Sequence, residues 1–257
     1  MKTTFFLIVI LLMMPITSFA YEPIPITYSA DRASVIFDGK WSFFTEWKES
    51  TLTDMGNENA QIKLRTAHQN DFIYVLVDFV SDVHLDKKID MSIICFDSEN
   101  NKSKLSDEND FCFSVSLGSE NGFIYQGGSP FALKQNFEKI YHPDFIAIGG
   151  VSDENDRYSK TPHTSYEFKI PLELIGRENV YGFYVGVHDS YTKTTYTWPE
   201  NIPVDTFTKI AKPNHWGEIY SPDKSLPEFE IPLLIITFSI IFYLVLVNRK
   251  PFSMLQK

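Results

Sequence analysis

The chain has 257 residues, with 33 acidic against 23 basic side chains and a formal net charge of −10. Lys2, Arg249, Lys250 and Lys257 lie near the two ends, so the stretch from Tyr21 to Glu230 holds 19 basic against 33 acidic residues, a net charge of −14. A surface of this charge repels nucleic acid and anionic lipid headgroups, which excludes both as partners, and it suits a solvated extracellular face or sites that collect cations.

The N-terminus is typical of a secretory signal peptide, which we place at residues 1–20. Lys2 is followed by an apolar run from Phe5 to Met14 and by the small residue Ala20. The run is too short to span a bilayer comfortably, because the hydrocarbon core needs roughly 20 helical residues. We expect cleavage after Ala20, and an uncleaved N-terminal anchor is the alternative.

The next 200 residues predict β-structure almost throughout. Alternating or β-prone runs predict strands at 61–67, 72–80, 91–97, 110–116, 122–126, 145–151, 164–170, 180–188 and 216–220. Helix is scarce: one turn at 171–175, stopped by Gly176, and a second short stretch at 130–136. Short strands separated by turns predict an all-β fold, an antiparallel, jelly-roll-like β-sandwich over residues 21–220.

The two cysteines, Cys95 and Cys112, lie in consecutive predicted strands. In a symmetric antiparallel hairpin centred between Ser103 and Lys104 they stand opposite each other. Facing residues on one side of such a pair have Cβ atoms about 4.5–5.5 Å apart, close enough for a disulfide. Because exported proteins favour pairing, we expect a disulfide, with two buried free thiols as the alternative.

The C-terminal end predicts a membrane anchor. Residues 221–230 contain two prolines and form a short stalk, and 231–247 is an apolar run without a polar face. Seventeen residues lie at the lower limit for a spanning helix, and a buried core helix is the alternative. The positive-inside rule places the tail 248–257 in the cytoplasm. We therefore expect a single-pass protein of the cell membrane with residues 21–230 outside the cytoplasm.

Five short motifs follow one another along the predicted domain. They are Val35–Gly39 with Glu46–Trp47, Asp71–Val75 with Asp78, Asp90–Asp97 with Asp107–Phe111, Tyr166–Leu172, and Trp198–Pro199 with Trp216–Gly217. In this order they resemble the family-9 carbohydrate-binding module and its wider DOMON-like sandwich relatives. The polar hairpin loop and the stretch from Ser129 to Tyr141 depart from that pattern. No catalytic domain accompanies the motifs, which puts a role in polysaccharide breakdown in doubt.

The resemblance implies binding of a polysaccharide or glycan by aromatic side chains, which stack on the apolar face of a sugar ring. Trp198, in the loop after residue 192, matches by position one of the rings with which the family clamps sugar. Trp41 is the next candidate, and Tyr191 and Tyr196 extend the platform. The two remaining tryptophans, Trp47 and Trp216, are expected to be structural.

The sequence offers residues for two cofactors, calcium and haem. Asp97, Asp107, Asn109 and Asp110 offer hard oxygen ligands from both sides of one hairpin, so a structural calcium ion is a candidate, with a solvated acidic turn as the alternative. Some DOMON-like domains bind b-type haem through methionine and histidine. The alternative function is therefore electron transfer by a bound haem. The candidate haem ligands in this chain are Met55, Met91, His142, His163 and His188.

An enzyme is not expected. The sequence has no Gly-x-Ser-x-Gly, no His-Glu-x-x-His and no phosphate loop, and 33 acidic residues make chance carboxylate pairs unavoidable. We predict a non-catalytic carbohydrate-binding domain, at most an accessory to polysaccharide hydrolysis. A protein-interaction module on the cell surface is the further alternative.

Overall fold

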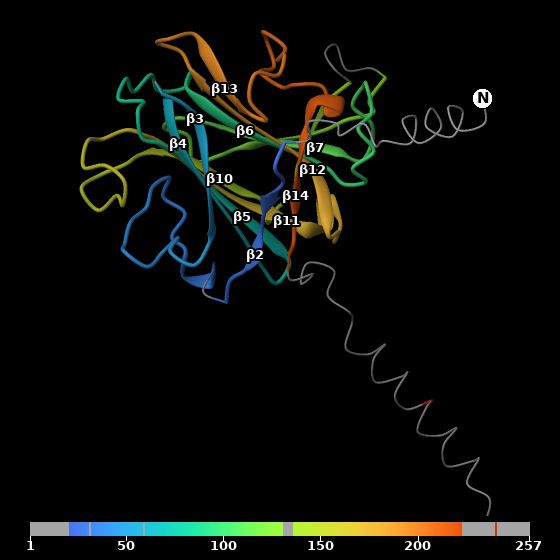
Figure 1. Ribbon diagram of the computed structural model, residues 1–257, viewed down its shortest axis with the longest axis horizontal. Coiled ribbons are helices and arrows are strands. Elements are labelled where there is room, and N and C mark those ends of the chain that lie inside the picture. The colour runs from blue at the N-terminus through green and yellow to red at the C-terminus, as the bar shows by residue number, and fades with distance from the viewer. Residues whose placement is uncertain (1–20, 31, 59, 131–135, 223–239, 241–257) are drawn as a thin grey trace, which may run out of the picture.

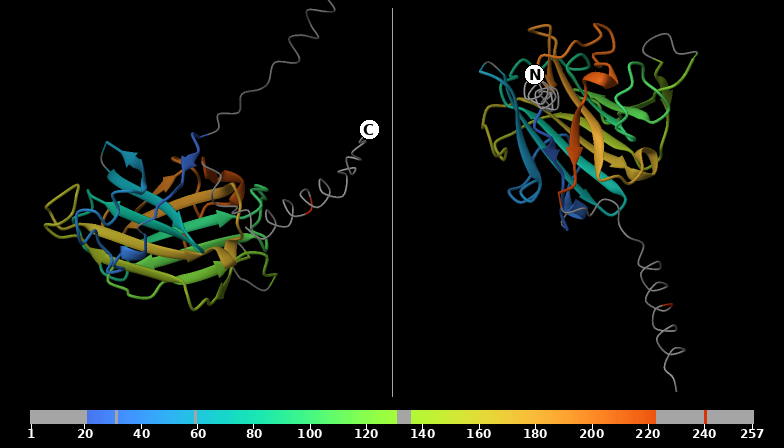
Figure 2. Two further views of the ribbon diagram at one scale, coloured as in Figure 1. Left: turned by 90° about the horizontal axis from the view of Figure 1, so that it is seen from below. Right: turned by 45° about the vertical axis from the view of Figure 1, so that its right-hand side comes forward.

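The computed structural model describes residues 21–30, 32–58, 60–130 and 136–222, together with Ile240. Within them the chain forms two β-sheets packed face to face, as Figures 1 and 2 show. The all-β sandwich predicted from the strand pattern is thus confirmed. The predicted signal peptide, the stalk beyond residue 222, the membrane segment apart from Ile240, and the tail lie outside the described residues, as does most of the short stretch 130–136.

The larger sheet contains eight strands in the described part of the chain, in the order β1-β14-β12-β6-β7-β8-β9, with β13 paired to β12. Their bounds are β1 (Ile24–Pro25), β6 (Met91–Asp97), β7 (Asp110–Ser116), β8 (Phe123–Gln126), β9 (Glu138–Ile140), β12 (Val180–Asp189), β13 (Thr194–Trp198) and β14 (Gly217–Tyr220).

The smaller sheet contains six of the described strands, in the order β10-β11-β5-β4-β2, with β3 paired to β4. Their bounds are β2 (Thr27–Tyr28), β3 (Thr51–Asn57), β4 (Ala60–Gln69), β5 (Phe72–Phe79), β10 (Ile146–Val151) and β11 (Thr164–Pro171). The helical elements are η1 (Arg32–Ser34), α2 (Leu172–Ile175) and η2 (Pro213–His215).

Strand pairing differs from the prediction in one respect. The sheets are mixed rather than wholly antiparallel, because β1 pairs parallel with β14 and β2 pairs parallel with β4. Both exceptions come from residues 24–28, which the alternation pattern did not mark as strands. Two-residue strands are too short to show a period of two, so their pairing is set by the sheet edges that they meet.

Three apolar clusters follow from the alternation of side chains across the strands. The inner faces of both sheets form the main core, with side chains such as Val75, Phe113, Phe168 and Phe183 fully buried. A second cluster covers the outer face of the larger sheet, and a third covers the outer face of the smaller sheet. Both faces of each sheet are therefore partly buried, which explains why so many strand residues are apolar.

The disulfide between Cys95 and Cys112 is formed as predicted. The two residues are paired in the register of β6 and β7, with Cα atoms 4.1 Å apart. The hairpin is therefore symmetric about the position inferred from the sequence. Both cysteines point to the outer face of the larger sheet, where they belong to the second apolar cluster.

One buried carboxylate holds the segment between η1 and β3 against the smaller sheet. Glu167 on β11 accepts hydrogen bonds from the backbone N–H groups of Asp38 and Gly39, at 3.0 and 2.8 Å, and from Trp47 Nε1 at 3.0 Å. Gly39 has φ of +84°, and a Cβ atom there would lie 2.5 Å from the nitrogen of Gly150. The motif residues around Asp38 and Trp47 are thus structural, as expected for Trp47.

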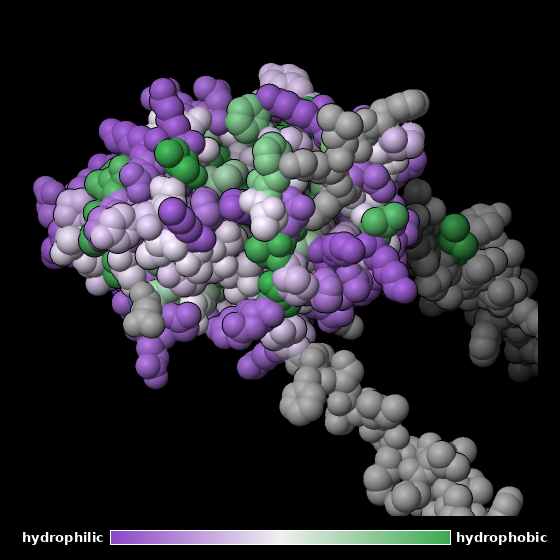
Figure 3. Space-filling model, turned by 90° about the horizontal axis from the view of Figure 1, so that it is seen from above, coloured by the Kyte–Doolittle hydropathy of each residue, from purple (hydrophilic) through white to green (hydrophobic). Residues whose placement is uncertain are grey.

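Among the described residues, none of the helices is long or apolar enough to cross a membrane. The face of the domain seen in Figure 3 is mainly hydrophilic, and its hydrophobic residues lie in small separate groups. This distribution agrees with the acidic composition of residues 21–230.

Candidate functional site

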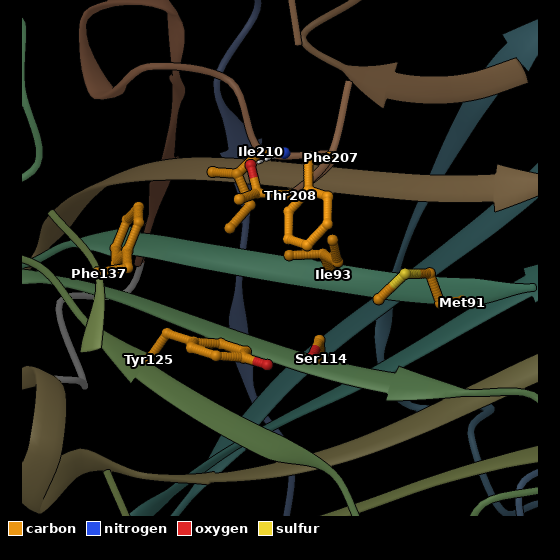
Figure 4. Close-up of a pocket in the computed structure, with 8 residues that line it drawn as sticks. All are labelled: Met91, Ile93, Ser114, Tyr125, Phe137, Phe207, Thr208 and Ile210. Carbon is orange, nitrogen blue, oxygen red and sulfur yellow. Dashed lines mark hydrogen bonds between the residues drawn. The ribbon is translucent and has the colours of Figure 1, made fainter. Parts of the chain in front are cut away.

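A groove of about 400 Å³ lies on the outer face of the larger sheet. Its floor comes from outward-pointing strand residues: Met91 and Ile93 on β6, Ser114 on β7 and Tyr125 on β8. Phe137 lies at one end. One wall is formed by three residues of the segment between β13 and η2, namely Phe207, Thr208 and Ile210. Figure 4 shows these side chains arranged around one space. The groove is concave and largely apolar, with three aromatic side chains, as ligand sites usually are.

The segment that carries Phe207 is fixed by hydrogen bonds. The Asp205 carboxylate accepts the N–H groups of Phe207 and Thr208, at 2.9 and 2.7 Å. Tyr184, projecting outward from β12, donates its hydroxyl to the carbonyl of Lys209 at 2.6 Å. The ring of Phe207 is nevertheless 72% exposed. The backbone is held while the ring remains accessible, which favours a role in contacting a ligand over a role in packing.

Polar groups lie at the Met91 end of the groove. His188 on β12 is the register partner of Met91 and shares a 3.1 Å hydrogen bond, through Nδ1, with the hydroxyl of Thr195. Burial, together with the charge of Lys209, lowers the pKa of His188, so the imidazole is neutral at pH 7. A neutral imidazole and two hydroxyls, those of Ser114 and Tyr125, can hydrogen-bond a polyhydroxylated ligand without charge.

The two tryptophans predicted to bind sugar are buried. Trp198 is 8% exposed; its ring packs 5.8 Å from Phe183, and a Cβ atom at Gly217 would meet it at 2.3 Å. Residues 194–198 form β13 rather than the predicted loop, and this strand joins the sheet and turns Trp198 into the core. Its edge still lines a separate hollow of about 430 Å³ with Tyr21 and Glu200. An alanine at this position would test packing rather than binding.

Trp41 is also enclosed, in the cluster outside the smaller sheet, with the Arg65 guanidinium 5.4 Å from its ring centre. The two tyrosines differ. Tyr196 packs on Phe79 at the margin of the core, whereas Tyr191 is 62% exposed and stacks on His84 at 3.7 Å. The four predicted aromatic residues therefore do not form one platform, and their part in sugar binding stays a prediction.

The predicted calcium ligands lie at the end of the β6–β7 hairpin. Asp97 and Asp110 are buried register partners, and Asp107 and Asn109 are half-buried in the loop. Several of these oxygens already accept hydrogen bonds within the hairpin. Asp97 accepts the N–H groups of Asn101 and Lys102, and Asp110 accepts that of Asp107. The Lys102 ammonium donates to the carbonyls of Trp216 and Gly217 nearby. Calcium at this hairpin stays a prediction.

The buried carboxyl group of Asp110 should make the free energy of unfolding depend on pH. Burial, with the charges of Asp97 and Asp107, raises its pKa to about 8 from the ordinary 3.8. The folded chain then keeps a proton that the unfolded chain releases between about pH 4 and 8, so the free energy of unfolding should fall as the pH rises through that window. In urea unfolding at pH 5, 6.5 and 8, the free energy of unfolding of Asp110→Asn should change less with pH than that of the wild type. Asp144→Asn is the control, because this side chain is exposed. The same pH dependence in Asp110→Asn and the wild type would contradict the assignment.

Sequence reasoning missed two clusters of potential metal ligands. Among the described residues, two groups of three bring their ligand atoms within 4.8 Å of one another, and both are fully buried. One is Asp78, Asp156 and His163. The other is Asp82, Asp90 and Asp189, and the residues predicted to bind calcium belong to neither. The ligands of each come from separate strands and loops, so no local spacing in the sequence marks them.

The Asp82–Asp90–Asp189 cluster is the better match for calcium, which takes oxygen ligands only. Burial and the charges of Asp189 and Asp90 raise the pKa of Asp82 to about 6. The fully buried hydroxyl of Tyr166 lies in the field of the three carboxylates, and burial together with these charges raises its pKa well above the ordinary value. If the resemblance extends to a structural calcium ion, these are the residues that would hold it.

The haem candidates are scattered. Met55 is in the core, His142 pairs with Glu173 at 3.3 Å, and His163 is buried against Asp78. Met91 and His188 are neighbours, but they stand directly opposite each other on adjacent strands and point to the same face. Axial ligands approach an iron from opposite sides, so this pair cannot sandwich a haem without rearrangement.

Comparison with known proteins supports the fold. The structure is similar to a carbohydrate binding module family 9 from Caldicellulosiruptor kristjanssonii in complex with cellotriose, with a TM-score of 0.51 and 15% identity over 78% of this chain and 93% of that chain. A module of the same description in complex with glucose has a TM-score of 0.47 and 15% identity, covering 78% and 95%. No family model and no curated protein sequence matches the chain. The resemblance to family-9 modules is confirmed as one of fold.

Proposed function

We propose that this chain is a carbohydrate-binding module and that its sugar site is the groove on the outer face of the larger sheet. The observation that carries the proposal is the set of aromatic side chains there, Tyr125, Phe137 and Phe207, on a fold shared with a module solved with cellotriose. Aromatic faces bury the apolar side of a pyranose, and the hydroxyls and the neutral His188 at the margin would bind its hydroxyl groups.

We also propose that the module is non-catalytic and is held outside a cell membrane. The sequence supports an export signal at 1–20 and an apolar anchor at 231–247 followed by Arg249 and Lys250. The acidic domain between them would remain in solvent next to an anionic bilayer, because like charges repel. Protease protection in sealed vesicles would test this orientation: residues 21–230 should be digested from the outside.

The binding test is a glycan array with the full-length chain purified in detergent, followed by titration of the best sugar. Phe207→Ala should weaken binding by about 10-fold or more, since a stacked ring contributes roughly 1–3 kcal/mol. Because the ring is exposed, the variant should keep the wild-type melting temperature. Phe44→Ala is the matched control: this ring is 67% exposed but lies on the segment that covers the smaller sheet.

Four outcomes separate the alternatives. Saturable glycan binding that Phe207→Ala weakens and Phe44→Ala leaves unchanged supports the proposal. Glycan binding that ignores both substitutions moves the sugar site elsewhere, with the hollow beside Trp198 as the next candidate. No binding to any glycan would overturn the function and favour a protein-interaction module, and a Soret band in the purified chain would favour haem.

A further inference from the structure

A second site is suggested by three side chains that meet outside the smaller sheet. Asp78 projects outward from β5, Asp156 lies in the segment between β10 and β11, and His163 ends that segment. Their side chains are at most 1% exposed, and His163 Nε2 lies 2.6 Å from Asp78 Oδ1 and 3.9 Å from Asp156 Oδ1. This cluster has no part in the groove, which is on the other sheet.

The hydrogen bonds of His163 fix which ring nitrogen is available. Nδ1 lies 2.7 Å from the carbonyl oxygen of Thr161 and 2.8 Å from the hydroxyl of Ser152. A carbonyl only accepts, so we infer that Nδ1 carries a hydrogen and that Nε2, which faces the two carboxylates, is the ring nitrogen available to a cation. Two electron-rich atoms 2.6 Å apart need a proton or a metal cation between them. Metal-binding histidines are oriented in this way, through the other ring nitrogen.

Polar atoms around the cluster are left without partners. Asp78 Oδ2, Asp156 Oδ2 and Ser165 Oγ are each buried and find no hydrogen-bond partner in the part of the chain that the structure describes. Ser165 is the register partner of Asp78 on β11, so its hydroxyl is on the same face of the sheet. Buried polar atoms normally have partners, so these oxygens require either a proton shared between the two carboxyl groups or a bound ligand.

Neighbouring cations do not supply that ligand. Lys63 is the register partner of Asp78 on β4, but its ammonium pairs with Asp54 at 2.6 Å. The Arg65 guanidinium donates to the hydroxyl of Tyr158 and the carbonyl of Ser50. The two basic side chains on this part of the sheet thus turn to other partners, while two carboxylates remain buried side by side.

We propose that Asp78, Asp156 and His163 bind a divalent transition-metal ion, for which zinc is the best fit. One imidazole nitrogen and two carboxylates form a donor set that zinc accepts, whereas calcium takes oxygen ligands only. The ion would join β5 to the segment 152–163 and so fasten that segment onto the sheet. Its role would be structural, and it is independent of sugar binding.

The test uses the full-length chain without a histidine tag, produced in zinc-supplemented medium because the site is buried. Elemental analysis should find one zinc per chain, and a chelator should lower the melting temperature by roughly 4 °C or more. Asp156→Asn should weaken zinc binding by about 10-fold or more, measured by competition with a zinc indicator. Asp189→Asn, in the oxygen-only cluster, and His142→Ala, which removes a histidine outside both clusters, should leave zinc binding unchanged.

Cobalt gives a readout that needs no variant. Co²⁺ added to the metal-free chain should produce visible absorption bands of a four-coordinate nitrogen and oxygen site, and zinc should abolish them. A wild-type chain that takes up no zinc and gives no such bands would overturn the proposal, even if Asp156→Asn fails to fold. Zinc uptake that Asp156→Asn leaves intact but His142→Ala removes would assign the metal to a site at His142 instead.

Discussion

Replacing Glu167 by alanine should lower the free energy of unfolding by about 3 kcal/mol or more. Its carboxylate accepts hydrogen bonds from the N–H groups of Asp38 and Gly39 and from the indole of Trp47, and the residue is fully buried. Alanine would leave these three donors unpaired, two of them buried and that of Asp38 partly buried, and each unsatisfied buried group costs roughly 1–3 kcal/mol. The loss should be partly offset, because burial and the charge of Glu46 raise the pKa of Glu167 to about 8 and so make its ionised form costly to keep in the fold.

Urea unfolding of the full-length chain in detergent, followed by tryptophan fluorescence, would measure this loss. Glu173→Ala is the matched control, because that carboxylate is exposed on α2 and its removal should change stability by less than about 0.5 kcal/mol. Glu167→Gln keeps an oxygen acceptor, so its loss in the free energy of unfolding should lie between those of Glu167→Ala and Glu173→Ala. A stability equal to that of the wild type for Glu167→Ala would show that the segment from Asp38 to Trp47 does not depend on this carboxylate.

Removing the disulfide with the double substitution Cys95→Ala and Cys112→Ala should lower the free energy of unfolding by about 2–4 kcal/mol. The bond closes a loop of 17 residues, so it restricts the unfolded chain as well as joining β6 to β7. Both cysteines are also buried under Tyr184 and Trp216, where alanine leaves a small cavity.

Reduction of the wild-type chain offers an independent measurement of the same quantity. The chain treated with reductant should unfold at a lower urea concentration than the oxidised chain, by nearly as much as the double variant does. A reductant should have no effect on the double variant. Equal midpoints for the oxidised and reduced wild type would mean that the disulfide contributes little to stability.

Local patterns predicted most of the strands because each strand buries one continuous face. The predicted run 91–97 coincides with β6 and 110–116 with β7, and the alternation at 164–170 falls within β11. The disulfide was predictable for the same reason: a symmetric hairpin has one register, and that register places Cys95 opposite Cys112. The strand β3 was missed because only one face of its seven residues contacts the core, at Met55.

The candidate groove could not be predicted because it depends on which segments cover the outer face of the larger sheet. Trp198 looked like an exposed loop residue, but β13 pairs with β12 and turns the ring inward. Phe207 gave no signal in the sequence beyond lying in a loop, and the structure leaves it exposed above Ile93 and Tyr125. Exposure of an aromatic ring is set by long-range packing, which no short window of sequence contains.

The sequence by itself determined the fold class, the bounds of strands such as β6 and β7, and the disulfide, because these follow from side-chain alternation and from pairing between neighbouring strands. Only the tertiary structure decided where aromatic rings and carboxylates meet. Asp78, Asp156 and His163 come from a strand, a loop and the end of that loop, and their proximity requires β5 and β11 to be adjacent in the smaller sheet. Sites of this kind form from contacts between residues far apart in the chain, so their chemistry becomes visible only once the sheets are assembled.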